Sequence, residues 1–348
     1  MGYFLDNRFH GLLNSFRLNR QQKAHRLSRT SEVLNSVESV VDGTDSKIRL
    51  VPGYKKKLQN DIQCSLEFAD DLVNQIPASI EVNRSTFATD PHVNAFFTNV
   101  TDLRSIFSHS SEIQDYMNDI HDNSAQCCAL LCMERTEKTV MGMELSGHIL
   151  KRDVLQVAVS FSDHRIYSPA PSEPETRAGL KSCLFQGLVS NALERIGKLR
   201  LASHHLQSQH QMLHARLKRY QQKSRTGRMD DRLLLAMDET SRELEKIEEQ
   251  IMKAPRVTPQ VVLEQVSDVF SKPDEFVRLR KSSIRLDKMG IKISDNSTQQ
   301  GNRLNLTEVM IGNDLPRVVT LATFPKKELI PGTVFSDSRS PGIAASFS

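Results

Sequence analysis

Four histidines in the sequence have a spacing that could hold a metal ion. His204, His205, His210 and His214 fall within one predicted helix. His210 and His214, at i and i+4, share a face from which two imidazoles could bind zinc. However, no Asp, Glu or Cys occurs between residues 195 and 229, and His210 also falls on an apolar seam, where a single polar residue commonly fixes helix register. We therefore predict no metal and no cofactor.

The cysteines are a second set of possible ligands. Cys127, Cys128 and Cys132 lack the CxxC spacing of zinc sites and have no matching second pair. In a strand, Cys128 and Cys132 point to the same face, as small buried hydrophobic residues do. Five cysteines in 348 residues, an odd number, do not resemble the disulfide framework of a small secreted domain. A reducing compartment is therefore expected, and with it a cytoplasmic location.

The tripeptide Asp163-His164-Arg165 is the group that most resembles a catalytic site, because Asp and His at the end of a strand can act as acid, base or orienting group. The strand predicted over residues 154–161 ends just before it. No nucleophile motif such as GxSxG accompanies it. The simpler interpretation is a polar turn. The sequence thus favours a protein without catalytic activity and leaves an enzyme centred on Asp163 and His164 as a third hypothesis.

The strand-like segments that must position these groups fall into two sets, far apart in sequence. In the first set, residues 127–134 and 139–145 flank the polar segment 135–138, which predicts a β-hairpin with its turn there, and strand 154–161 follows. The second set consists of residues 276–286, 291–294, 304–311 and 318–324. Because a three-stranded piece alone is marginally stable, we expect both sets to join one sheet.

The predicted fold class is therefore α+β, with a small antiparallel sheet in a β-rich domain formed by residues 125–168 and 273–326. Two separate β lobes are the alternative. Residues 1–124 are predicted to be mainly helical, and residues 258–271, which open with a Thr-Pro pair typical of a helix start, form a connecting helix. The tail 331–348, rich in Gly, Ser and Pro, is expected to be disordered.

Between the two strand sets, residues 172–253 predict an inserted, long antiparallel helical hairpin. Ser172 and Glu175 have the spacing of a capping box, and Gly227 interrupts the helical pattern. A heptad repeat on both arms indicates a coiled coil. The residues expected to form its seam are Ile196, Leu199, Leu206, Leu213, Leu217, Met237, Leu244 and Ile247.

The two arms of this hairpin differ in length. The first arm is roughly 75 Å long if its helix is continuous from Pro174 to Ser224. The second arm, residues 230–253, is only roughly 36 Å long, so it can pair with about half of the first arm. The apolar first half of the long arm, with Leu180 and Leu188, must then be buried against the domain body or against another chain. This excess of apolar helix surface favours a protein partner or self-association.

The closed end of the hairpin is basic, because residues 195–232 hold ten Lys or Arg and only two acids. The cations expected at this tip include Arg216, Arg219, Lys223, Arg225 and Arg228. Such a tip could bind phosphates without regard to sequence and with a strong dependence on salt. Tyr220 is the sole aromatic residue nearby, and acids of the return arm can pair with some of the charge. Nucleic acid is therefore the alternative partner.

Composition and net charge limit the classes of protein that remain possible. The net charge is +4, and the longest apolar run, residues 127–133, is far shorter than the roughly 20 residues that a membrane helix needs, so no integral membrane contact is expected. No motif indicates a small-molecule ligand. The sequence predicts a non-enzymatic protein-interaction or oligomerisation protein acting through the coiled-coil hairpin. The alternative is sequence-independent nucleic-acid binding through the hairpin tip and the basic N-terminus.

Overall fold

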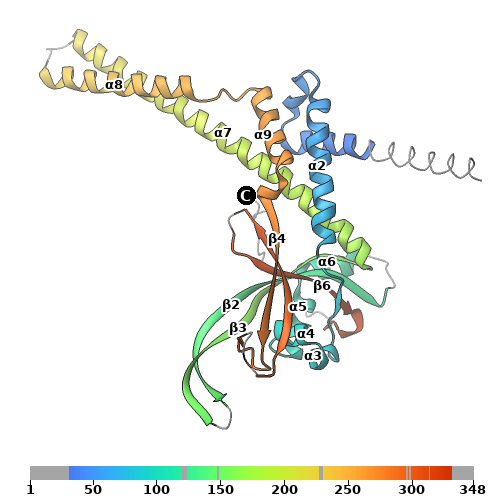
Figure 1. Ribbon diagram of the computed structural model, residues 1–348. Helices are drawn as coiled ribbons and strands as arrows, with labels where there is room; N and C mark the ends of the chain where they lie inside the picture. Colours follow the sequence, from blue (N-terminus) through green and yellow to red (C-terminus); the bar gives the residue numbers. More distant parts are fainter. Residues whose placement is uncertain are drawn as a thin grey trace, which may run out of the picture. The chain divides into compact units, whose positions relative to one another are not determined.

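The computed structural model describes residues 31–119, 124–146, 149–226, 230–294, 297, 299–312 and 314–330 (Figure 1). The predictions for the basic N-terminus and for the tail 331–348 lie outside these residues. The chain divides into two compact units. Of the described residues, the helical unit contains those within 31–65 and 187–271, and the sheet unit contains those within 66–186 and 272–330.

The sheet unit contains one sheet, in which the described strands have the order β3-β2-β6-β5-β4 and β1 pairs in parallel with β6. The bounds are β1 Ile80–Glu81, β2 Gln126–Ser146, β3 Ile149–Ala170, β4 Val277–Leu286, β5 Asn302–Ile311 and β6 Arg317–Pro325. β2 and β6 pair in antiparallel, with Gln126 opposite Pro325 and Glu134 opposite Arg317. The two strand sets therefore form one sheet: the predicted α+β fold is confirmed, and the alternative of two lobes is wrong.

The predicted turn at residues 135–138 is also wrong, because β2 runs through it without a break. The polar side chains of this stretch stay in the strand because distant residues pair with their charges. Arg135 Nη1 lies 2.7 Å from Glu308 Oε1, and Lys292 Nζ lies 3.1 Å from Glu137 Oε2. β2 and β3 consequently form a ribbon much longer than the small sheet predicted from the sequence.

One face of the sheet packs against four short helices. Their bounds are α3 Thr86–Thr89, α4 Pro91–Phe96, α5 Val100–His109 and α6 Ser111–Asp119. Alternation along β2 brings Leu131 and Met133 to this face, where they are fully buried. Phe107 of α5 stacks on Phe324 of β6, with 4.5 Å between the ring centroids. This apolar core holds the helices on the sheet.

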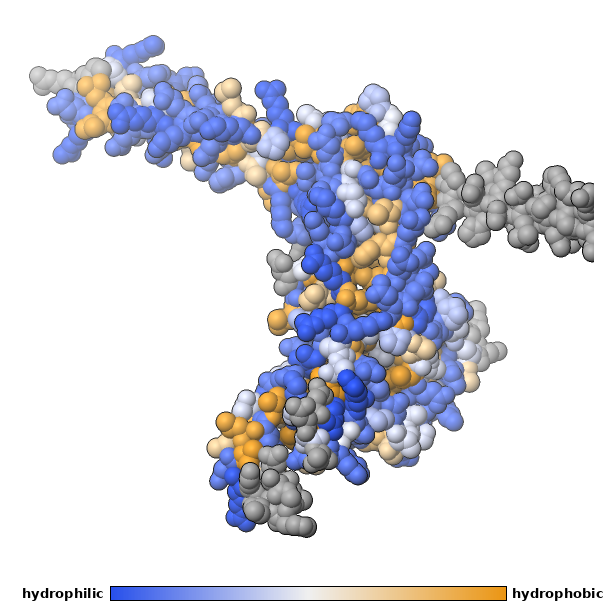
Figure 2. All heavy atoms as spheres, in the orientation of Figure 1, coloured by the Kyte–Doolittle hydropathy of each residue, from blue (hydrophilic) through white to orange (hydrophobic). Residues whose placement is uncertain are grey.

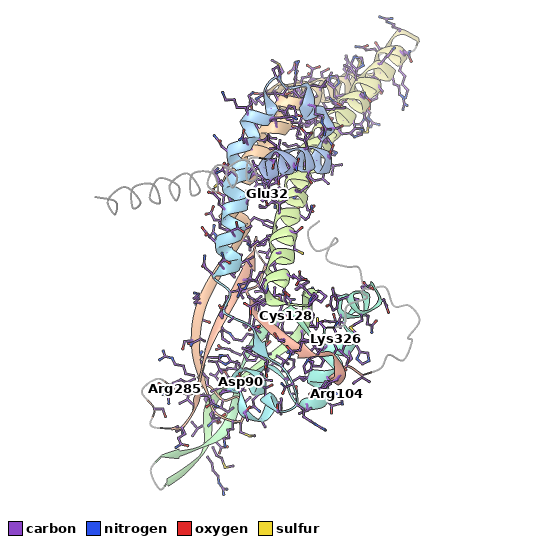
Figure 3. The ribbon with its side chains drawn as sticks, turned by 90° about the vertical axis from the view of Figure 1, so that its right-hand side faces the viewer. Glu32, Asp90, Arg104, Cys128, Arg285 and Lys326 are labelled. Atoms are coloured by element: carbon purple, nitrogen blue, oxygen red, sulfur yellow. The ribbon has the colours of Figure 1, made fainter. Side chains whose placement is uncertain are left out.

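The opposite face of the sheet is covered by parts of two long helices, α2 (Tyr54–Asn74) and α7 (Glu173–Thr226). Val73 of α2 and Leu180 of α7 belong to the apolar cluster on this face, against which Leu130 of β2 packs. The buried Thr176 Oγ1 donates a hydrogen bond of 2.8 Å to the carbonyl of Cys128 (Figure 3). This bond fixes the first turn of α7 on the sheet.

The described part of the helical unit contains the helical segment 31–44, the 3₁₀ helix η1 (Ser46–Leu50), the first part of α2, α7 from residue 187, α8 (Asp231–Lys253) and α9 (Pro259–Ser271). Leu188, Ala192 and Ile196 of α7 are buried, as are Val266 and Phe270 of α9. The apolar first half of α7, which was expected to require cover, is therefore covered by residues of this same chain.

A charge cluster in the helical unit provides a testable dependence of stability on pH. The Glu38 carboxylate accepts hydrogen bonds from Tyr54 Oη and Arg49 Nη2, each at 2.8 Å, and lies 2.7 Å from Lys55 Nζ. The Lys55 ammonium, followed by Arg49 and Tyr54, lowers the pKa of Glu38 to about 2. Because this folded-state pKa lies below the ordinary value of 4.5, the stabilisation is present above pH 4.5 and is lost as the pH falls toward 2.

We expect Glu38→Gln to lower the free energy of unfolding by about 1 kcal/mol at pH 7, a modest value because the partly exposed carboxylate is screened by solvent. The loss should shrink to a small fraction near pH 2, where Glu38 is about half protonated in wild type as well. Urea unfolding of wild type and Glu38→Gln at pH 7 and at pH 2 measures this loss of free energy. A loss of equal size at both pH values would mean that the carboxylate charge is not what stabilises this cluster.

Candidate interaction site on the helical hairpin

The catalytic-looking tripeptide does not form an acid–base pair. β3 continues past it with a shift of its register against β2, and Asp163 and His164 contact different partners. The Asp163 carboxylate lies 2.6 Å from Arg317 Nη2, and the guanidinium groups of Arg317 and Arg165 lower the pKa of Asp163 despite its partial burial. His164 Nε2 lies 2.7 Å from the Phe96 carbonyl, and burial lowers the pKa of His164. Both side chains are held by structural contacts.

All five cysteines are free thiols; Cys128 and Cys132 are buried, as predicted, and Cys127 is buried as well. Burial raises the pKa of Cys132, so its thiol stays protonated at neutral pH and is a poor nucleophile. Among the described residues, no group of three or more His, Cys, Asp or Glu side chains could hold a metal ion. The ring centroids of His210 and His214 lie 6.1 Å apart.

α7 and α8 form the predicted long antiparallel helical hairpin (Figure 1). Their less exposed residues recur at alternating intervals of three and four, which is the spacing of a heptad. On α7 these positions are Leu199, Ser203, Leu206, His210, Leu213, Leu217 and Tyr220, and on α8 they are Leu233, Met237, Thr240, Leu244, Ile247 and Ile251. All the residues predicted for the seam are buried or half-buried, Ile196 included.

Two of these seam positions have little exposed surface: Leu213 is 7% exposed and Thr240 is 4% exposed. Thr240 was not predicted as a seam residue, because threonine is not counted as apolar when a heptad pattern is sought in the sequence. Its hydroxyl donates a 2.7 Å hydrogen bond to the Ala236 carbonyl, so the polar group is satisfied within its own helix. The threonine can therefore occupy the seam without leaving a polar group unpaired.

Polar contacts also join the two helices. His210 Nε2 lies 3.2 Å from Glu248 Oε1. Beside this pair, side chains of both helices line a shallow hollow formed by Gln207, His210, Gln211, Glu248, Ile251 and Met252. These contacts place the C-terminal part of α8 against residues 207–211 of α7.

The basic tip holds five cations that the structure describes. Arg216, Lys218, Arg219, Lys223 and Arg225 are all exposed, whereas Arg228 lies outside the described residues. The ion pairs found on α7 and α8 involve other basic residues, such as Arg242 with Asp238 and Lys253 with Glu249. Within the part of the chain that the structure describes, no carboxylate lies within 4.0 Å of the charged nitrogens of those five side chains.

Apolar side chains are exposed alongside these cations. Met212, Arg216, Arg219 and Lys223 follow one another at i, i+4, i+7 and i+11, so they lie on one face of α7, outside the seam. We call these four residues the outer stripe. Among the described residues of α7 and α8, the other large apolar side chains that are exposed are Leu193, Leu201, Leu234, Leu235 and Met252. Figure 2 shows apolar residues among the hydrophilic ones that cover most of the hairpin.

Comparison with known proteins does not indicate a function for this chain. No family model, no curated protein and no solved structure matches the chain. Among the described residues, no helix combines the length and the apolar character needed to cross a membrane. The class that the fold and the site define is an α+β protein with a long antiparallel helical hairpin.

Proposed function

We propose that this chain is a non-enzymatic protein-interaction protein of the cytoplasm, and that its coiled-coil hairpin α7–α8 is the element that binds the partner. The observation that carries the proposal is the outer stripe, in which exposed, unpaired cations adjoin an exposed methionine. A surface of this kind fits a protein that presents acidic and apolar side chains together. The five free thiols agree with a reducing compartment.

Because the seam is buried, the partner must contact another surface of the hairpin. Leu213 and Thr240 are already covered within the hairpin, and Leu188 and Ile196 in the first half of α7 are buried as well. The surface left for binding is the outer side of the two helices. A partner therefore docks on a preformed hairpin and does not complete its seam, which keeps the ordering cost of binding low.

Nucleic acid is the second candidate, and the five unpaired cations of the tip favour it. Two features favour a protein more. Nucleic-acid grooves place stacking aromatic rings beside their cations, and Tyr220, the aromatic residue of this stretch, is half-buried on the seam. Exposed leucines and methionines, in contrast, gain little from a phosphate backbone but are buried readily at a protein interface.

The test is the triple variant Arg216→Glu, Arg219→Glu and Lys223→Glu. Its matched control carries Lys281→Glu, Lys288→Glu and Lys327→Glu, three exposed residues of the sheet unit, and changes the net charge equally. Substitutions at such exposed sites alter stability by only a few tenths of a kcal/mol each, so both variants should fold.

The amount of each protein that the three baits recover is measured by affinity capture from nuclease-treated lysate followed by quantitative mass spectrometry. We expect at least one protein that wild type and control recover equally and that the stripe variant recovers at least tenfold less, because truncating interface cations of this kind is typically worth more than 1 kcal/mol. Equal recovery of every protein by all three baits would contradict the proposal. Retention on heparin and DNA that falls only in the stripe variant, with unchanged protein recovery, would establish the second candidate instead.

A further inference from the structure

The ribbon formed by β2 and β3 leaves the sheet and is only two strands wide. β6 pairs with β2 as far as Glu134, and beyond that residue the described β2 pairs with β3 alone. Backbone hydrogen bonds link a neighbouring loop to β3 at Val157 and Val159, through Lys292 N and the Gly290 carbonyl. Past Val157, no described residue outside the ribbon pairs with either strand (Figure 1). An isolated two-stranded ribbon is only marginally stable, so a further surface packed on it would stabilise it.

One face of this ribbon is apolar and uncovered. Met141 stands directly opposite Leu155, and these side chains are 68% and 71% exposed. Met143, two residues along, is 62% exposed. By alternation these residues follow Val159 and Phe161, which belong to the buried core. The core face of the sheet thus continues along the ribbon into solvent, and Figure 2 shows apolar residues gathered there. We call Met141, Met143 and Leu155 the ribbon patch.

The charges around the ribbon patch indicate what it binds. On the same face, at the base of the ribbon, the Glu137 carboxylate is paired with Lys292, and Arg135 is paired with Glu308. These two cations therefore have carboxylate partners, and Lys138 alternates to the opposite face of β2. A phosphate-rich partner, whether nucleic acid or anionic lipid, would need cations at this place.

We propose that the ribbon patch is a self-association surface on which a second copy of this chain packs its own ribbon patch. A two-fold arrangement places Met141 of one copy on Leu155 of the other, so the uncharged patch is complementary to itself. Homodimer interfaces are more apolar than other contact surfaces, in agreement with this choice. The surface lies in the sheet unit, so this association is independent of partner binding by the hairpin.

The exposed area of the ribbon patch sets the expected strength of the dimer. Three exposed Met and Leu side chains offer roughly 400 Å² per copy, about half of the ~800 Å² that each partner buries in a stable interface. The dimer should therefore be weak and reversible. Sedimentation velocity from about 5 to about 500 µM covers the range in which an interface of this size associates.

Wild type is expected to show a weight-average mass that rises with concentration toward twice that of the monomer. Leu155→Glu and, separately, Met141→Glu should each remain monomeric throughout. Ser160→Glu, an exposed change of equal charge on the opposite face of the ribbon, should associate as wild type does. Circular dichroism and thermal unfolding verify that all variants fold.

Three outcomes would overturn the proposal. One is a wild type that stays monomeric at the highest concentration. Another is association that persists unchanged in both glutamate variants. The third is a monomeric wild type that cosediments with phosphatidylcholine vesicles through Leu155, which would assign the ribbon patch to a lipid surface. Recovery of hairpin partners by the glutamate variants should be unaffected, so this test and that of the proposed function can fail separately.

Discussion

Arg177→Ala is expected to lower the free energy of unfolding of the sheet unit by about 3 kcal/mol. The Arg177 guanidinium donates to three backbone carbonyls around the end of α2: Nη1 to Val73 at 2.6 Å, and Nη2 to Ile76 at 2.9 Å and to Pro77 at 3.0 Å. Its Nε donates to Glu173 at 2.9 Å. Val73 lies in the last turn of α2, where carbonyls lack an i+4 partner, and Ile76 and Pro77 follow the end of the helix, so a positive side chain that binds all three carbonyls is especially stabilising.

The shape of the side chain matters as much as its charge. Arg177→Lys keeps the positive charge but cannot reach three carbonyls with one ammonium group, so about two thirds of the loss should remain, roughly 2 kcal/mol. Lys181→Ala is the control, because Lys181 forms an exposed ion pair with Asp70 in the same helix region and should cost less than about 0.5 kcal/mol.

Urea unfolding followed by circular dichroism measures all three variants against wild type. A loss for Arg177→Ala no larger than that for Lys181→Ala would show that the carbonyls find water in place of the guanidinium. A complete rescue by lysine would show that charge alone, and not the fork of hydrogen bonds, holds the end of α2.

The long hairpin was predictable because its signals are local. Helix starts, heptad spacing and a glycine break all lie within a few residues of one another, and the seam positions from Leu199 to Leu217 follow from period alone. The α+β class was predictable for the same reason, since two sets of strand patterns flank the helices. Ser172 and Glu175, read as a capping box, do interact: the serine hydroxyl donates to the Glu175 carboxylate at 2.7 Å.

What the sequence could not reveal depends on residues far apart in the chain. Residues 135–138 look like a turn until Glu308 and Lys292 are placed beside them. The same limit applies to α7: the sequence leaves open whether the domain body or another chain buries its apolar first half, and only the structure shows that Leu180 and Leu188 are buried within this chain. Of the candidate site, the seam and the tip cations were identified, but Met212 was missed because an exposed methionine has no periodic signature.

Leu213→Asp is the second change with a large expected effect. Leu213 lies on the seam and is 7% exposed, so an aspartate there would bury a charge without a partner and remove apolar packing. The matched control is Met212→Asp, the adjacent residue, which is 58% exposed on the outer stripe. It introduces the same side chain into the same turn of helix without entering the seam.

Hydrogen exchange of the α8 amides in these proteins is the most direct test of the central claim, which is that α7 and α8 close on each other within one chain and present their outer faces to the partner. We predict that wild type and Met212→Asp protect α8 equally and that Leu213→Asp lowers this protection about a hundredfold, corresponding to ~3 kcal/mol. If α8 in Leu213→Asp remains as protected as in wild type, the seam does not hold the hairpin together, and the claim is contradicted.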